Sequence, residues 1–272
     1  MLTLFSAAGP LGRYWYAVTR SADLHYGPVA VHVFSHDLVF WRGPSGDVIA
    51  AADRCAHRKT ALSTGIVKNG GLVCPNHGWV FGDNGRCVGK PSGLPPANKD
   101  NLSTLPSAEA YGLVWVCLRE PDGHIIDVPW ENTPSYRRIE SGVWQWQAPA
   151  SRIMEQALAA SPADASISFD LPFTCTTHTQ LSDGAMQIRL LSCSPVDSRR
   201  SLVASVVWTN DLSQSDSVAR QARIDAEDLR LRAERDPYED SGTQDALTGY
   251  DDGTPLARWR RRLADLFERS AT

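Results

Sequence analysis

Cys55-Ala56-His57 and Cys74-Pro75-Asn76-His77-Gly78-Trp79 are the two stretches that decide how this sequence is read. Each holds one cysteine and one histidine, spaced first as C-x-H and then as C-x-x-H, with sixteen residues between the two groups. Thiolates and neutral imidazoles are metal ligands. The two stretches therefore predict a metal centre held by two short loops.

The alternation of cysteine and histidine is typical of a Rieske [2Fe–2S] cluster, in which two thiolates hold one iron and two imidazoles hold the other. Because neutral imidazoles replace anionic thiolates, the added electron is better stabilised, and the potential lies at roughly −150 to +300 mV. We therefore predict Cys55, His57, Cys74 and His77 as the ligands of a one-electron carrier.

A zinc site is the competing interpretation of the same four residues. Zinc prefers paired C-x-x-C or H-x-x-x-H elements and closes as a tetrahedron. Pro75, Gly78 and Trp79 have no role in a generic zinc knuckle. A cluster loop, in contrast, must turn sharply and offer backbone N–H groups to the sulfurs, which suits Pro75 and Gly78. The pattern favours the cluster.

Composition restricts the remaining possibilities. The chain has 272 residues, 42% of them hydrophobic, which is enough for two ordinary cores. Its formal net charge of −4 gives no reason to expect nucleic acid or an anionic membrane as partner. No apolar run reaches the roughly 18–20 residues of a membrane span, and residues 1–12 lack the basic segment of a secretion signal. We expect a cytoplasmic protein. Its other cysteines show no paired spacing and read as reduced thiols: Cys87, Cys117, Cys175 and Cys193.

Turn signals divide the chain into two parts. Residues 1–130 read as short strands, with β-rich runs such as 29–34 and 38–41 and with two ligand loops between strands. Residues 121–134 contain three prolines and are the predicted linker. Residues 135–272 read as α+β. Their predicted strands are 142–147, 173–181, 185–193 and 201–209, and their predicted helices are 152–160, 216–235 and 255–269.

Four motifs carry a family resemblance. They are Asp53-Arg54-Cys55-Ala56-His57-Arg58, Leu62-Ser63-x-Gly65, Cys74 to Trp79, and Gly85-x-Cys87. With them, the run from Trp15 to Pro91 resembles the N-terminal half of Rieske non-haem iron oxygenase alpha subunits, and the one-component demethylase and monooxygenase branch is the closest in pattern. The resemblance implies an all-β Rieske [2Fe–2S] domain over residues 1–130, followed by a shortened α+β helix-grip domain over residues 135–272.

The second half departs from this family. There, two histidines and one carboxylate hold a mononuclear Fe(II), with the pattern N-x-x-D-x-x-H-x-x-x-x-H and a late Asp. The corresponding positions here are Gln156, Ala159, Pro162 and Ile167, none of which is a histidine or a carboxylate. From residue 134 onward the only histidine is His178. We therefore expect no mononuclear iron in this chain and assign no catalytic residue.

The residues that are missing all belong to one half of the electron-transfer path in the resembled family. In the resembled family, electrons cross a subunit boundary in a head-to-tail trimer, from a cluster histidine of one chain to an Asp of the next. This chain keeps the donor side and lacks the receiving side. We therefore expect an accessory electron-transfer subunit in a hetero-oligomer. Its partners would be a Rieske-family catalytic subunit that carries iron and a ferredoxin or flavin reductase.

Two alternatives remain open. One is a self-sufficient oxygenase whose metal site uses His178, the late Asp228 and a residue from a neighbouring chain. The other is a structural or regulatory partner in which the cluster stabilises the fold. His178 is otherwise read as a structural histidine, and Asp228 as a solvated helix carboxylate next to Glu227 and Arg230. The sequence does not show the substrate of any assembly.

Overall fold

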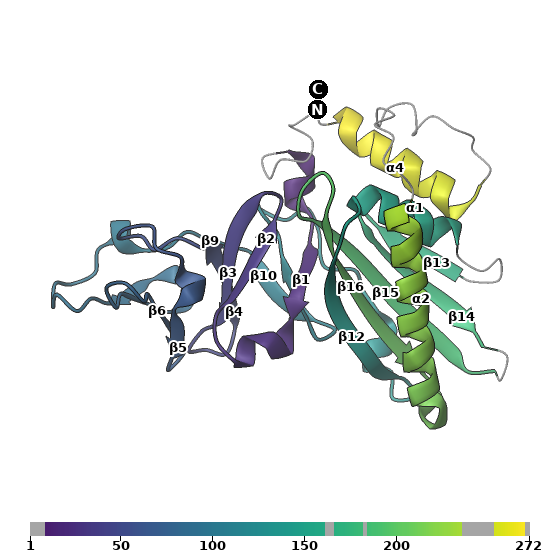
Figure 1. Ribbon diagram of the computed structural model, residues 1–272, viewed down its shortest axis with the longest axis horizontal. Coiled ribbons are helices and arrows are strands. Elements are labelled where there is room, and N and C mark those ends of the chain that lie inside the picture. Colours follow the sequence, from purple (N-terminus) through teal and green to yellow (C-terminus); the bar gives the residue numbers. More distant parts are fainter. Residues whose placement is uncertain (1–8, 161–165, 182–183, 236–252, 270–272) are drawn as a thin grey trace.

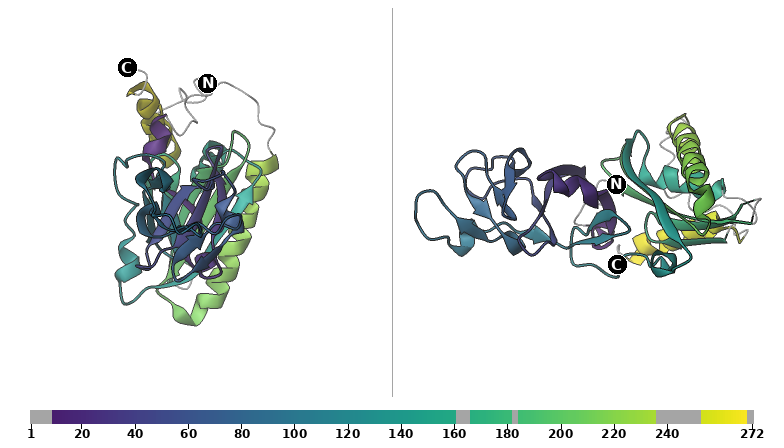
Figure 2. Two further views of the ribbon diagram at one scale, coloured as in Figure 1. Left: turned by 90° about the vertical axis from the view of Figure 1, so that its left-hand side faces the viewer. Right: turned by 90° about the horizontal axis from the view of Figure 1, so that it is seen from below.

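The computed structural model describes residues 9–160, 166–181, 184–235 and 253–269. Along its longest axis lie a narrow lobe, a central body and a wider C-terminal domain, in that order (Figure 1). The right-hand view of Figure 2 shows the same order from below, with the long helices in the C-terminal domain.

The central body consists of two antiparallel sheets of short strands. The first has the order β1-β11-β10 and the second the order β2-β3-β4-β9. Val39, Phe40 and Trp41 of β3 are all fully buried, because this strand has packing on both of its faces. The strands of the body are β1 (Tyr16–Arg20), β2 (Val29–Val33), β3 (His36–Arg42), β4 (Val48–Ala52), β9 (Thr104–Leu105), β10 (Ser107–Ala110) and β11 (Leu113–Val116).

The narrow lobe contains both predicted ligand loops, and we call residues 53–103 the ligand lobe. Its own sheet has the order β5-β6-β7-β8, with β5 (Ile66–Lys68), β6 (Gly71–Val73), β7 (Val80–Phe81) and β8 (Cys87–Gly89). The chain leaves the body after β4 and returns at β9, and Ala51 pairs with Thr104 across these two strands. Leu72 and Phe81 of the lobe pack with Trp41 of the body in one apolar cluster.

The C-terminal domain is built on one five-stranded antiparallel sheet with the order β12-β16-β15-β14-β13. The helices contact this sheet, and the β1-β11-β10 sheet of the body packs against its other face. The elements are β12 (Arg137–Trp146), α1 (Ala150–Ala159), β13 (Ser166–Asp170), β14 (Thr174–Gln180), β15 (Met186–Pro195), β16 (Ser201–Thr209), α2 (Ser215–Arg235) and α4 (Pro255–Arg269).

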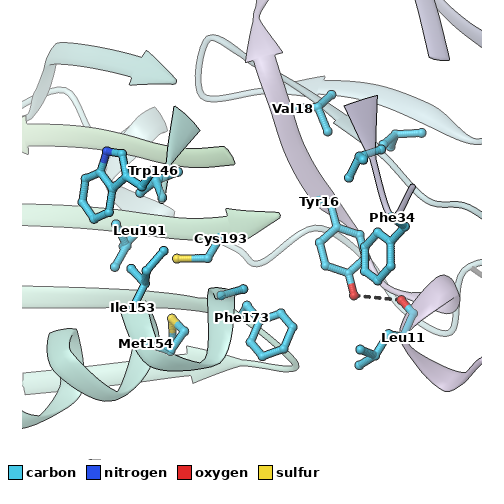
Figure 3. Packing of buried hydrophobic residues seen from close by; sticks show 14 of the residues in the cluster. Leu11, Tyr16, Val18, Phe34, Trp146, Ile153, Met154, Phe173, Leu191 and Cys193 are labelled. Atoms are coloured by element: carbon cyan, nitrogen blue, oxygen red, sulfur yellow. Dashed lines mark hydrogen bonds between the residues drawn. The ribbon is translucent and has the colours of Figure 1, made fainter. Parts of the chain in front are cut away.

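The body and the C-terminal domain share backbone contacts and a core. Phe34 N–H donates to the Pro195 carbonyl over 2.7 Å, and Ser194 Oγ–H donates to the Ala17 carbonyl over 2.7 Å. One apolar cluster runs from Tyr16 in β1 to Ile153 in α1 (Figure 3). The two parts are therefore held together by buried surface as well as by the connecting chain.

The three predicted helices are confirmed to within two residues at each end. The all-β first part and the α+β second part are confirmed as well. The predicted strands did not include β13, which follows the first of these helices. The segment aligned with the family's ligand-bearing helix ends as a helix at Ala159, and Ile167 lies in strand β13. Pro162 lies outside the described residues.

The proposed linker, residues 121–134, is closely packed against the rest of the chain. Val128 is 1% exposed, and its N–H donates to the Tyr111 hydroxyl over 2.9 Å. The short 3-10 helix Pro129–Asn132 follows directly. The exact domain limits, 1–130 and 135–272, stay a prediction. None of the described helices has the length and apolar character needed to cross a membrane.

Candidate metal centre

The two ligand loops close with the same backbone hydrogen bonds. In the first loop, Cys55 N–H donates to the Thr60 carbonyl over 2.8 Å, and Lys59 N–H donates to the Cys55 carbonyl over 2.9 Å. In the second loop, Cys74 N–H donates to the Trp79 carbonyl over 2.8 Å, and Gly78 N–H donates to the Cys74 carbonyl over 3.0 Å. In each loop, the backbone of the cysteine is thus hydrogen-bonded to the residues four and five positions after it.

Both loops need a left-handed residue at the fourth position after the cysteine. Gly78 has a φ of 64° there and Lys59 a φ of 59°. Glycine adopts this conformation without strain, whereas the lysine is held in it by the loop. The role assigned to Gly78 from the sequence, a sharp turn, matches this geometry.

Further contacts hold the two loops in place. Asp53 accepts hydrogen bonds from the Ser63 N–H, over 2.8 Å, and from the Ser63 hydroxyl. Asn76 Nδ2 donates to Thr60 Oγ1 over 3.2 Å and thereby joins the second loop to the first. Gly65 packs so closely against β6 that a Cβ there would lie 2.2 Å from the Val73 carbonyl oxygen. These contacts account for the positions of Asp53, Ser63 and Gly65 relative to Cys55 in the sequence motifs.

The four predicted ligands divide into two pairs. Cys55 and Cys74 are buried, at 1% and 2% exposure, and lie in the same buried cluster. His57 and His77 are exposed, and their ring centroids lie 4.7 Å apart. Burial raises the pKa of the Cys55 thiol, and the neighbouring Cys74 raises it further. Partial desolvation and the nearby His77 lower the pKa of His57, which keeps its imidazole neutral.

This division fits a binuclear cluster, which needs two thiols for one iron and two imidazoles for the other. A tetrahedral zinc ion needs its donors around a single point. Within the described part of the chain, no three histidine, cysteine, aspartate or glutamate side chains gather around one point. The donor set and its pairing are therefore compatible with a [2Fe–2S] group.

A row of side chains that the sequence did not reveal supports His57. Trp79 stacks on the His57 ring with a centroid separation of 4.8 Å and an interplanar angle of 7°. Lys90 Nζ lies 4.8 Å from the centre of the Trp79 ring, and Lys90 also pairs with Asp100. Asp100 is 6% exposed and accepts a second hydrogen bond from the Ala97 N–H. No sequence spacing indicated Lys90 or Asp100.

A second candidate region is a cavity of about 340 Å³ in the C-terminal domain, between the sheet and helices α1 and α2. Asp228 lies at its wall, together with Trp144 and Arg189. Arg189 is tied to Asp225 of α2 over 2.7 Å. Cys175 lines the same cavity, and burial raises the pKa of its thiol to about 12.

His178 does not reach this cavity. Along β14, Cys175, Thr177 and Thr179 face the cavity, so the alternation of a strand directs His178 to the opposite face. There it pairs in register with Ile188, and its ring meets Trp130 edge-to-face at 4.2 Å. Burial lowers the pKa of His178, which keeps the ring neutral. The structure therefore does not bring His178 and Asp228 together.

The remaining histidines lie at the surface, and the remaining cysteines are free, as their unpaired spacing predicted. His25, His32, His36 and His124 are exposed, and His32 Nδ1 lies 2.7 Å from an oxygen of Asp37. The four cysteines outside the ligand loops are free and buried: Cys87, Cys117, Cys175 and Cys193.

Comparison with known proteins identifies the first part of the chain. Residues 14–106 match the model of the Rieske [2Fe-2S] domain. The iron-sulfur subunit TsaM2 of a toluene-4-sulfonate monooxygenase system from Comamonas testosteroni is 31% identical over 150 residues, which are 53% of this chain and 42% of that protein. The oxygenase component of dicamba O-demethylase from Stenotrophomonas maltophilia is 34% identical over 131 residues, which are 46% of this chain and 38% of that protein. The matched sequence thus spans less than half of either relative.

The fold is shared over a longer stretch. The structure of NdmA from Pseudomonas putida CBB5 has a TM-score of 0.76 and 22% sequence identity, and covers 95% of this chain and 91% of that one. A structure of apo dicamba monooxygenase has the same TM-score at 18% identity, and covers 96% of this chain and 98% of that one. The fold of the C-terminal domain is therefore shared with these structures as well as that of the first part.

Proposed function

This chain is homologous to the Rieske non-haem iron oxygenases through its Rieske [2Fe–2S] domain, and we propose that it is an accessory electron-transfer subunit of a heteromeric member of that group. It would pass electrons to the iron of a partner catalytic subunit. The cluster ligands would be Cys55, His57, Cys74 and His77. When bound, the cluster would supply one-electron transfer at roughly −150 to +300 mV.

The residues of the ligand lobe would serve such a carrier in two ways. The buried pair Cys55 and Cys74 shields its side of the centre from water, while the exposed pair His57 and His77 forms its outlet to other proteins. The shared hydrogen-bonded closure of the two loops would hold the backbone that carries the four predicted ligands in place. Pre-set ligands reduce the rearrangement that accompanies a change of redox state.

The two faces of the C-terminal sheet separate the residues that a second metal site in this chain would need. His178 is the only histidine after residue 134, and it packs against Trp130 on the body side. Asp228 lies at the cavity on the helix side. One carboxylate without imidazoles is a weak site for Fe(II). This separation favours a partner that supplies the catalytic iron over a self-sufficient oxygenase.

The names of two relatives describe parts of larger systems. One is the iron-sulfur subunit of a monooxygenase system, and the other is the oxygenase component of a demethylase. By analogy, we propose a reductase or ferredoxin as the electron source of this chain and a second Rieske-family chain as its acceptor.

Metal analysis tests the proposal. Iron and acid-labile sulfide are measured per chain on anaerobically purified protein, followed by EPR of the dithionite-reduced form. We expect two irons, two sulfides and a Rieske-type spectrum, with no further iron retained after Fe(II) is added and desalted. A third, tightly held iron that reacts with nitric oxide would overturn the accessory role.

Matched histidine variants assign the metal. His77→Ala should remove the Rieske spectrum and lower the iron content, whereas His178→Ala should leave both unchanged. Loss of iron in His178→Ala with an unchanged Rieske spectrum would instead place a second iron in the C-terminal domain, contrary to the proposal.

A further inference from the structure

Two opposite charges lie next to the support of one predicted cluster ligand. Lys90 and Asp100 form an ion pair, and their side chains are only 10% and 8% exposed. The Lys90 ammonium also lies 4.8 Å from the centre of the Trp79 ring, which stacks on His57. A row of contacts therefore joins the ion pair to His57 through one aromatic ring.

Burial separates Lys90 from the other basic side chains of the ligand lobe. The lobe has seven lysine and arginine residues, and the other six are exposed: Arg54, Arg58, Lys59, Lys68, Arg86 and Lys99. Water and dissolved ions screen an exposed charge strongly, whereas a charge among protein atoms acts over a longer distance. The Trp79 ring, which screens far less than water, lies between the ion pair and His57 in the row of contacts.

Asp100 is held as an anion by two donors. The Lys90 ammonium donates to one of its oxygens, and the Ala97 N–H donates to the same oxygen over 2.7 Å. Both hydrogen bonds lower the pKa of Asp100. Because the Ala97 donor belongs to the backbone, it would remain if the lysine were replaced. Asp100 would then be a buried negative charge without its cation.

From this arrangement we propose that Lys90 and Asp100 tune the reduction potential of the cluster with opposite signs. The inference rests on the proposed electron-carrier function and adds the residues that adjust the potential. Reduction adds one electron, supplied by an external reductant, to the cluster and forms or breaks no bond. A positive charge nearby stabilises the more negative reduced state, and a negative charge destabilises it.

The intact pair hides these two effects from each other. Opposite charges in contact cancel most of their field at a distance, so the pair as a whole changes the potential little. Removing the charge of Lys90 leaves the anionic Asp100 uncompensated, which should lower the potential. Removing the charge of Asp100 leaves the ammonium beside Trp79 uncompensated, which should raise it. The sign of the shift is therefore specific to each partner.

Redox titration of charge-removal variants tests the proposal. Wild type, Lys90→Gln, Asp100→Asn and the double variant are purified anaerobically and titrated with dithionite at pH 7 with mediator dyes, and the visible circular dichroism of the cluster is followed. We expect the equilibrium constant for reduction to fall about tenfold in Lys90→Gln and to rise about tenfold in Asp100→Asn, which is about 59 mV for one electron. The double variant should lie within about twofold of the wild type.

The matched control is Lys68→Gln. It removes an exposed lysine of the same lobe, which pairs with Gly71 at the end of its hairpin away from Cys74. Because solvent screens this charge, the equilibrium constant should stay within about twofold of the wild type. A tenfold fall in Lys68→Gln would show that any positive charge of the lobe has this effect, and it would overturn the special role of the pair.

Stability is checked in the same samples, because removing one partner of a buried ion pair destabilises a protein. Iron content and the oxidised spectrum show which variants keep their cluster. The double variant leaves no uncompensated charge. If Lys90→Gln loses its cluster, the rise in Asp100→Asn and its reversal in the double variant decide the question.

The outcomes separate this inference from the proposed function. A wild-type protein without a dithionite-reducible cluster would remove the proposed function itself. A normal cluster whose potential is unchanged in both single variants would overturn the tuning role alone. Shifts of the same sign in Lys90→Gln and Asp100→Asn would also overturn it, because they would report a change in solvent access to the cluster in place of opposed charges.

Discussion

The indole of Trp79 lies flat on the imidazole of His57, with their centroids 4.8 Å apart and their planes 7° from parallel. This stack holds the ring of a predicted cluster ligand in one orientation, although the ring stands at the surface where solvent would let it rotate. Trp79 is held in turn by Lys90 above its ring. The predicted ligand His57 is thus exposed to solvent and still held in one orientation.

Replacing Trp79 tests the stack. Aromatic pairs contribute about 0.5–1.5 kcal/mol beyond burial, so Trp79→Ala should speed loss of the cluster by about 2- to 13-fold. Trp79→Phe keeps a ring and should lose the cluster at nearly the wild-type rate. The decay of visible absorbance in the presence of a chelator measures this. Equal decay in all three proteins would show that the stack has no role in retaining the cluster.

Gly65→Ala should damage the first ligand loop. A Cβ at this position would lie 2.2 Å from the backbone oxygen of Val73, so the loop and β6 must move apart. Overpacking of this kind costs about 1–3 kcal/mol. We expect a lower urea midpoint and a lower iron content. Gly123→Ala is the matched control, since nothing lies within 4 Å of its added Cβ, and its stability should change by less than about 0.5 kcal/mol.

Cys175 should resist alkylation at neutral pH. Burial raises the pKa of its thiol to about 12, so about one molecule in ten thousand is thiolate at pH 8, against about a quarter for an ordinary thiol. The thiolate fraction, and with it the labelling rate, should rise about tenfold per pH unit. Mass spectrometry of iodoacetamide-treated protein reads this out. Rapid labelling at pH 8 in the folded state would mean that the cavity wall opens to solvent.

His178 should make the protein less stable in mild acid. Its pKa is lowered in the folded state, so the unfolded chain binds a proton more readily below its own pKa of about 6.5. The contribution of the neutral His178 ring to the free energy of unfolding is therefore fully present above about pH 6.5. It is lost as the pH falls toward the lower pKa of the folded state. His178→Phe keeps a ring against Trp130 and removes the titration.

Urea unfolding at pH 7.5 and 5.5 compares the two proteins. The loss of stability between these pH values should be smaller in His178→Phe than in the wild type. The iron content should be the same in both, because His178 lies away from both pairs of predicted ligands. An equal loss of stability in the two proteins would assign the pH dependence to other groups.

The ligand loops and the long elements could be predicted because their information is local. The C-x-H and C-x-x-H spacings identify the two ligand loops. The apolar periodicity of residues 216–235 and 255–269 predicts a helix over each of these ranges. Strands of two or three residues, such as β7 and β8, are too short for alternation to show. Their position depends on pairing with β6 and with one another.

Long-range pairing accounts for the rest of what was missed. Lys90 and Asp100 stand ten residues apart in a loop without periodicity, so no pattern joins them to each other or to Trp79. Strand β13 was not among the predicted strands, because its five residues form a strand through pairing with β14. Which face of the C-terminal sheet His178 occupies depends on the register of β14 against β15.

The pairing of Ala51 with Thr104 has a consequence for engineering. Because the chain departs from the body and re-enters it on adjacent strands, the paired residues Ala51 and Thr104 that flank residues 53–103 lie about 5 Å apart. The redox module is therefore an insertion with matched ends. It could be transplanted into the corresponding hairpin of another sheet, or exchanged for a lobe of different charge, without altering the path of the chain through the body.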